Sequence, residues 1–176
     1  MRAAFARRIV IGFTALVLIV LVLVAGMRAY LGGAEEERLR PDEDVAITQL
    51  RGPLPQNAFI ACPQGYCTVA EAMTSPVFTT AADRLFGFWM EMIAAEPRVV
   101  QVAAQPEQHR YVFMQRTPVL RFPDIVIVEF IALAPDRSSL AIYSRSRYGR
   151  YDFGVNRRRV VRWLSRLQQL AGAVSQ

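Results

Sequence analysis

An uninterrupted apolar stretch near the start of the chain constrains its architecture more than any other feature. Ile9–Met27 is 19 residues long and contains no charged side chain. At a rise of about 1.5 Å per residue, a helix of this length nearly spans the ~30 Å hydrocarbon core of a bilayer. We therefore expect a transmembrane helix. The alternative is a cleaved signal peptide with Gly32 and Ala34 near its cleavage site, but the apolar region of such a peptide is usually about 7–15 residues long.

Charges on the two sides of this stretch predict its orientation. Arg2, Arg7 and Arg8 precede it, whereas Arg28 and the acidic run Glu35–Glu37 follow it. Because positively charged flanks stay in the cytoplasm, the N-terminus is expected there. We expect a single-pass protein of the bacterial inner membrane whose larger C-terminal part lies in the periplasm.

Composition divides the chain into three parts. Residues 1–31 form the cytoplasmic N-terminus and transmembrane helix, residues 32–57 an acidic, proline-containing linker, and residues 58–176 a soluble domain. The linker composition buries little apolar surface. All 21 basic residues are arginine, so chemistry that depends on a lysine is excluded.

Two cysteines enclose a short turn at the start of the soluble domain. Cys62 and Cys67 flank Pro-Gln-Gly-Tyr, in which proline and glycine favour a tight turn. A local disulfide is the first interpretation, given the oxidising compartment. A zinc site would need two more ligands, and the chain offers only His109; the C-x-x-C-H pattern of haem attachment is absent. No metal or cofactor is expected.

The pattern of the soluble part predicts a small α+β domain. Thr79–Glu96 has the apolar spacing of a helix, with Thr80 and Asp83 placed as a capping box. A second helix is expected at Arg157–Leu170. The segments between them are rich in Val, Ile, Tyr and Phe, and predict about four strands: Arg98–Ala104, Arg110–Thr117, Asp124–Leu133 and Ser139–Ser146. Two helices covering one face of an antiparallel sheet is the expected architecture.

The link into the last helix carries the most distinctive polar residues. Gly149 and Gly154 suit positive φ angles, and Asp152 and Asn156 suit hydrogen bonds with the amides at a helix start. The following helix has an apolar stripe opposite a basic one. The apolar stripe is Val160, Leu164, Leu167 and Ala171, and the basic one is Arg158, Arg162 and Arg166. Roles in a turn and in a helix cap are sufficient to explain Gly149, Asp152, Gly154 and Asn156, without any further function.

A site for an anion is the second interpretation of the same link. Six arginines lie near the start of the helix: Arg145, Arg147, Arg150, Arg157, Arg158 and Arg159. Guanidinium groups at a helix N-terminus attract lipid phosphate, a carboxylated ligand or an acidic partner. The expected periplasmic location argues against nucleic acid. Asp124, which follows Phe122-Pro123 and opens the most apolar strand, is a candidate polar residue of a site.

These motifs resemble the domain-of-unknown-function 1499 family. Its members typically end in S-R-x-G-x-x-D-x-G-x-N-R-x-R before an amphipathic helix. The residues here that match are Ser146, Arg147, Gly149, Asp152, Gly154, Asn156, Arg157 and Arg159. Phe122-Pro123-Asp124 resembles the family's F-x-D, and the Cys62–Cys67 loop resembles its cysteine-containing portion in a shorter form; Tyr143 stands where the family has arginine. The resemblance implies a small α+β envelope domain with no established activity.

One functional expectation follows from the membrane anchor, the basic C-terminal surface and the lack of a recognisable set of catalytic nucleophile residues in the sequence. It is a non-enzymatic accessory subunit that stabilises a larger inner-membrane complex, respiratory or photosynthetic, through membrane lipids and integral-membrane partners. One alternative is a ligand-binding or hydrolytic domain in which Asp124, Arg147, Asp152 and Asn156 converge on one cavity. Another is recognition of anionic lipid by the arginines.

Overall fold

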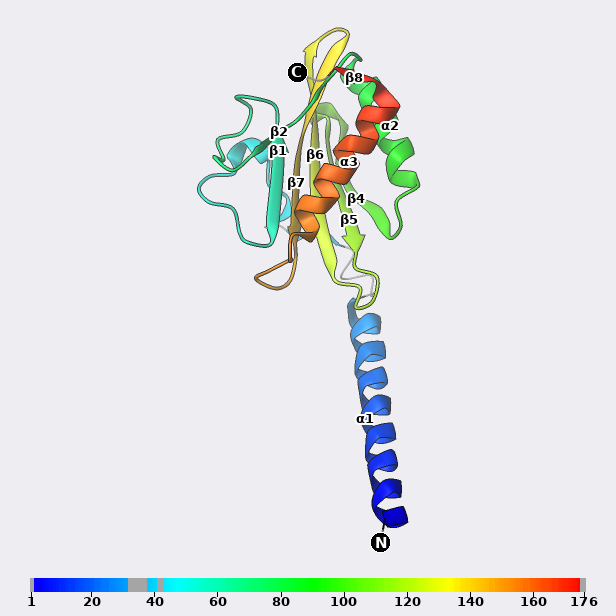
Figure 1. The fold of residues 1–176 in the computed structure, drawn as a ribbon. Helices are drawn as coiled ribbons and strands as arrows, with labels where there is room; N and C mark the ends of the chain where they lie inside the picture. The colour runs from blue at the N-terminus through cyan, green and yellow to red at the C-terminus, as the bar shows by residue number, and fades with distance from the viewer. Residues whose placement is uncertain (1, 32–37, 41–42, 175–176) are drawn as a thin grey trace.

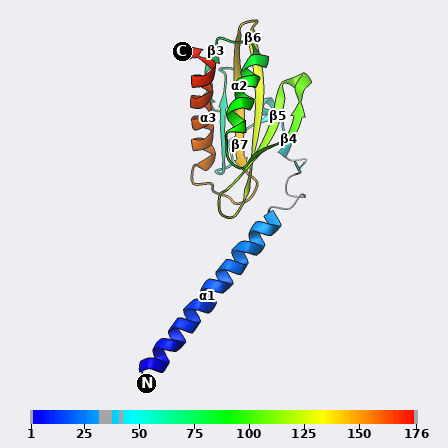
Figure 2. The same ribbon diagram turned by 90° about the vertical axis from the view of Figure 1, so that its right-hand side faces the viewer.

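The computed structural model describes residues 2–31, 38–40 and 43–174. The beginning of the expected linker lies outside the described residues, and so do Gly32 and Ala34. Helix α1 (Arg2–Leu31) projects from one end of an α+β domain (Figures 1 and 2). Within its segment Arg7–Leu31, the most apolar 18-residue window has a mean hydropathy of 3.0, and none of that window is buried. By length and composition this helix is able to cross a membrane. A signal sequence near the N-terminus meets the same criteria of length and composition.

A twisted sheet forms the centre of the domain, with its strands in the order β2-β1-β7-β6-β5-β4, while β3 pairs with β7 and β8. The strands are β1 (Ala58–Cys62), β2 (Met73–Thr74), β3 (Val77–Phe78), β4 (Val99–Gln105), β5 (Arg110–Arg116), β6 (Pro123–Ala134), β7 (Arg137–Ser146) and β8 (Ala173–Val174). The expected four-stranded meander corresponds to β4 through β7, which pair antiparallel in chain order.

The expectation of an antiparallel sheet of about four strands is correct only in part. Strand β1 extends the meander beside β7, and β2 pairs parallel with β1, so the sheet is mixed. The additional strands β2, β3 and β8 are two residues long, too short for an alternating pattern to reveal them. β1 has the sequence AFIAC, which also lacks alternation.

The helices α2 (Ala82–Ala94) and α3 (Val155–Ala171) cover one face of the sheet, as expected (Figure 2). Trp89 and Trp163 meet edge to face between them, with ring centroids 5.6 Å apart. The expected capping box at the start of α2 is wrong. Ala81 occupies the N-cap position without a side-chain hydrogen bond, and the carbonyl of Thr80 instead accepts a bond from Ser138.

The opposite face of the sheet is covered by irregular chain. The short 3-10 helix η3 (Ile47–Gln49) and the cysteine loop pack there, and Ile47 is fully buried against a second apolar cluster. Strand β5 is buried along its whole length because both faces are covered. Chain that the composition assigned to a linker therefore contributes to this core.

Candidate functional site

The turn that joins β7 to α3 is built around the carboxylate of Asp152. Its Oδ1 accepts the backbone N–H of Gly154 at 2.9 Å, and its Oδ2 accepts that of Asn156 at 2.7 Å. Gly149 and Gly154 have φ angles of 83° and 75°, the left-handed conformation expected of them. Gly154 occupies the N-cap position of α3, which begins at Val155, and the carboxylate of Asp152 satisfies amides at this helix start from two residues further back.

Asn156 lies in the first turn of α3 with its side chain fully buried. Its Nδ2 donates to the carbonyl oxygen of Asn57 and to Asp152 Oδ2, each at 2.9 Å, and to Ser146 Oγ at 3.2 Å. Its Oδ1 accepts the hydroxyl of Ser144 at 2.6 Å. Instead of capping the helix through its side-chain oxygen, Asn156 connects α3 to β7 and to the residue before β1.

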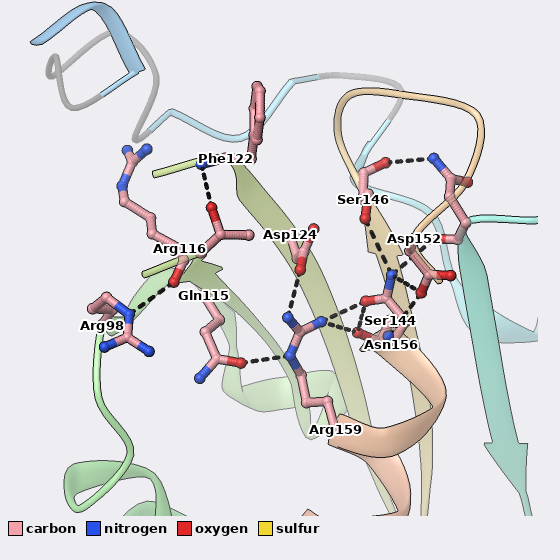
Figure 3. A network of polar contacts seen from close by, with 12 residues as sticks. Arg98, Gln115, Arg116, Phe122, Asp124, Ser144, Ser146, Asp152, Asn156 and Arg159 are labelled. Carbon is pink, nitrogen blue, oxygen red and sulfur yellow. Dashed lines mark hydrogen bonds and ion pairs between the residues drawn. The ribbon is translucent and has the colours of Figure 1, made fainter. Parts of the chain in front are cut away.

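Arg159 is the centre of the network, one turn further along α3 (Figure 3). Its guanidinium donates to Asp124 on β6 and to Gln115 on β5, and its Nη1 also donates to Ser144 on β7 at 2.9 Å. The side chains of Arg159 and Asp124 are only 4% and 3% exposed. The two separate sequence motifs thus meet as a buried ion pair that fixes α3 across three neighbouring strands.

Sequence reasoning missed several members of this buried network. Gln115 and Ser144 sit in strand segments whose apolar neighbours dominated the prediction, and Asn57 lies at the predicted end of the linker. Each is polar and buried, which is uncommon unless hydrogen-bonded. A polar residue inside an otherwise apolar strand could have indicated a buried hydrogen bond. It does not reveal which residue is the hydrogen-bond partner.

Arg147 belongs to a different buried pair, on the face of the sheet away from the helices. Its Nε and Nη2 bind the two carboxylate oxygens of Glu43 at 2.6 Å each, and its Nη2 also donates to the carbonyl oxygen of Arg38. The side chains of Arg147 and Glu43 are 1% and 0% exposed. Arg145 approaches the same carboxylate at 3.9 Å. This pair holds the segment before η3 against β7.

The other arginines of the predicted anion site lie on the surface in separate surroundings. Arg150 stacks over the ring of Tyr151, and Arg157 over Phe59. Arg158 donates to the carbonyl oxygen of Phe153 at 2.9 Å. The six arginines therefore do not all meet at one site. Arg159 and Arg147 are buried in two different ion pairs, and Arg145 lies near the carboxylate that Arg147 binds. Arg150, Arg157 and Arg158 contact three different neighbours.

Two hollows border the turn. One has a volume of ≈ 330 Å³ and is mainly apolar; Asp124 and Asp152 are among its lining residues. The other has a volume of ≈ 580 Å³ and includes Arg145, Arg147 and Arg150 in its lining. Asn156 is buried beneath the turn. The four residues of the ligand-binding alternative are thus divided between two hollows and the interior, and the carboxylates of Asp124 and Asp152 already have internal partners.

The sequence profile of a family described as "Protein of unknown function (DUF1499)" matches residues 65–167. This match spans more than half of the chain and includes both motifs of the buried network. The chain belongs to the DUF1499 family. No curated protein and no solved structure matches it significantly. In this DUF1499 domain, Asp124, Asp152, Asn156 and Arg159 act together to hold the last helix on the sheet.

The cysteine loop of the DUF1499 domain supports a second buried carboxylate. Cys62 and Cys67 lie at disulfide-bonding distance, with their Cα atoms 6.1 Å apart. Tyr66, inside the loop, donates its hydroxyl to Glu129 on β6 at 2.9 Å. Burial raises the pKa of Tyr66, and the neighbouring charge and hydrogen bond of Glu129 raise it further, so the hydroxyl stays protonated as a donor. The loop therefore positions a hydrogen-bond donor for a buried charge.

Reduction of the Cys62–Cys67 pair is expected to lower the free energy of unfolding by about 2 kcal/mol, because so short a loop removes limited entropy from the unfolded chain. Urea unfolding of the full chain with and without reductant measures this difference. The double variant Cys62→Ser/Cys67→Ser is the control and should show no response to reductant. Equal stability of the wild type under both conditions would mean that the cysteines are not paired in solution.

An ion pair between the two helices makes stability depend on pH. Glu96, just after α2, accepts hydrogen bonds from Arg162 at 3.0 Å and from Arg166, both on α3. Burial alone would raise the pKa of Glu96, but interactions with Trp163, Arg162 and Arg166 outweigh it and bring the pKa below its ordinary value of 4.5. The ionised form is therefore favoured in the folded protein.

Because the pKa of Glu96 is lower in the folded than in the unfolded state, its contribution to stability is present above about pH 4.5 and disappears as the pH falls through the folded pKa. Glu96→Gln is expected to destabilise the domain at pH 7 by about 1 kcal/mol or less, since both arginines are half-exposed and screened by solvent. Urea unfolding between pH 3 and 7 should show the two proteins converging in acid. A constant difference across this range would contradict the assignment.

Proposed function

We propose that this chain is a non-enzymatic, single-pass inner-membrane protein whose periplasmic DUF1499 domain is an accessory subunit of a larger membrane complex, respiratory or photosynthetic. Helix α1 is the observation that carries the proposal. Its apolar surface is exposed along the most hydrophobic window, so it is available to lipids and to the helices of a partner. An anchor of this kind brings the domain to a membrane assembly.

The connection between helix and domain supports a positioning role. Arg116, buried at the end of β5, donates to the carbonyl oxygen of Leu31, the last residue of α1. The side chain of Leu31 is 2% exposed although its helix neighbours are exposed. This contact ties the end of the anchor to the sheet, so a partner bound to α1 would hold the domain at a defined place.

The role of the motif residues supports the same proposal. Asp124, Asn156 and Arg159 are engaged with one another, and Asp152 accepts backbone amides at a helix start. The contribution of these contacts to the stability of the fold explains why the four motif residues are present. A rigid domain with a membrane anchor suits an accessory subunit. The cysteine pair agrees with an oxidising compartment, and the arginines before α1 favour a cytoplasmic N-terminus.

Purification of the tagged full chain in mild detergent tests the proposal. We expect integral-membrane proteins to be recovered with it in a fixed ratio. The matched control carries an unrelated apolar helix of equal length in place of residues 7–31, which preserves anchoring but removes the specific α1 surface. Loss of the partners in this control would identify α1 as the contact. Recovery of the native chain only as a lone monomer would contradict an accessory role.

A further inference from the structure

Two loops of the domain lie at the end of the sheet from which α1 leaves. One loop joins β5 to β6 (residues 117–122), and the other joins β7 to α3 (residues 147–154). Both views show them at the end of the domain from which α1 projects (Figures 1 and 2). The contact between Arg116 and Leu31 fixes the anchor beside the first loop. If α1 crosses the membrane, as proposed above, these loops face the bilayer surface.

Large apolar side chains are exposed on these loops. Among the described residues outside α1, the three large hydrophobic side chains with the greatest exposure are Phe153 at 90%, Val119 at 59% and Tyr151 at 58%. All three lie in the two loops. A single exposed apolar residue is ordinary, but a group at one end of a domain marks an interaction surface.

The backbone at Phe153 adds an independent observation. Its φ angle is 51°, in the left-handed region that bulky residues disfavour and that glycine or asparagine tolerates. An aromatic side chain at this position has two unfavourable effects on the stability of the fold. Its backbone is strained, and its ring is exposed to water. The stability of the domain therefore does not explain this residue.

The polar surroundings of these side chains fit a lipid headgroup layer. Arg150 is exposed beside Tyr151, and Arg158 is exposed and holds the carbonyl of Phe153. The carboxylate of Asp152 between them is engaged with backbone amides. Tyrosine and phenylalanine rings flanked by arginines suit the boundary between acyl chains and phosphates.

We propose that Val119, Tyr151 and Phe153 insert into the headgroup region of the bilayer that α1 crosses, with Arg150 and Arg158 near lipid phosphates. The domain then has two attachments to the membrane, the helix and the loop end of the sheet. This second attachment rests on the proposed membrane anchoring of α1. It restricts the tilt of the domain and sets which surface it presents to a partner.

Tryptophan quenching by brominated lipids tests this contact directly. In full-length chain reconstituted into vesicles of phosphatidylcholine and phosphatidylglycerol with bromine on the acyl chains, Phe153→Trp should add a fluorescence component that is quenched at least twofold. The native Trp89 and Trp163 are fully buried in the core and give a constant background. Leu133→Trp, near the β6–β7 hairpin at the opposite end of the sheet, is the matched control and should not be quenched.

A second variant separates docking from folding. Phe153→Asn suits the left-handed backbone, so its unfolding midpoint should equal or exceed that of the wild type. In lipid nanodiscs, however, the loop of residues 147–154 should exchange its amide hydrogens faster in this variant. Equal exchange in the two proteins would contradict membrane docking of the loop.

The outcomes distinguish the two proposals. If the Phe153→Trp chain resists carbonate extraction but its added fluorescence component is unquenched, the docking is overturned and the anchor stays intact. Blue-shifted emission of that component without bromine quenching, when a partner is present, would assign the loops to protein contact and also overturn the lipid docking. Complete extraction of the chain by carbonate would overturn both proposals.

Discussion

Replacing Arg159 by methionine is expected to lower the free energy of unfolding by about 3–5 kcal/mol. The variant leaves the carboxylate of Asp124 buried at 3% side-chain exposure without its positively charged partner. It also removes donors to Gln115 and Ser144. Urea unfolding of the full chain in detergent, followed by the fluorescence of Trp89 and Trp163, measures the loss.

Two further variants establish the cause of this effect. Arg157→Met makes the same change two residues away on the same helix, where the side chain is exposed and contacts only the ring of Phe59 among its described interactions; it should change stability by less than about 1 kcal/mol. The double variant Asp124→Leu/Arg159→Met removes both charges and should recover a large part of the loss. If Arg159→Met were as mild as Arg157→Met, the buried pair would not be formed in solution.

Replacing Glu43 by alanine is the second change with a large expected effect, again about 3–5 kcal/mol. It leaves the guanidinium of Arg147 at 1% exposure without the carboxylate that binds it through two hydrogen bonds. The segment before η3 should separate from the sheet as a result. Trypsin cleavage after Arg38 is then expected to become faster, so urea unfolding and proteolysis should change together.

Glu91→Ala supplies the matched control for this change. Glu91 is an exposed residue of α2, and its replacement should alter stability by no more than about 0.5 kcal/mol. Glu43→Gln keeps the hydrogen-bonding shape without the charge and is expected to fall between the two. Unchanged stability and unchanged trypsin cleavage in Glu43→Ala would show that the segment behaves as the linker its composition suggested.

The local sequence pattern was sufficient to predict the helices and strands that have a strong apolar periodicity. The apolar run became α1, the 3.6-residue spacing became α2 and α3, and the β-branched segments became the antiparallel β4–β7 meander. The glycines of the link into α3 and the carboxylate of Asp152 at the start of this helix were also predictable, because turn and cap preferences act over a few residues.

The same reasoning could not place residues whose partners are distant in sequence. It treated the arginines before and within α3 as one basic cluster, whereas Arg147 and Arg159 enter the interior on opposite faces of the sheet to meet Glu43 and Asp124. Nor did the acidic composition around Glu43 indicate burial, because the charges that offset the cost of burying that carboxylate belong to Arg145 and Arg147, more than a hundred residues later.

By itself, then, the sequence determined an apolar helix able to cross a membrane, an α+β domain and the turn that starts its last helix, since each depends on neighbouring residues. Only the tertiary structure decided which polar side chains are buried partners and which remain on the surface. It joined Asp124 to Arg159 inside the domain and left Tyr151 and Phe153 exposed on the loop between β7 and α3. The physical reason is that burial and charge pairing depend on which strands and loops the fold brings together.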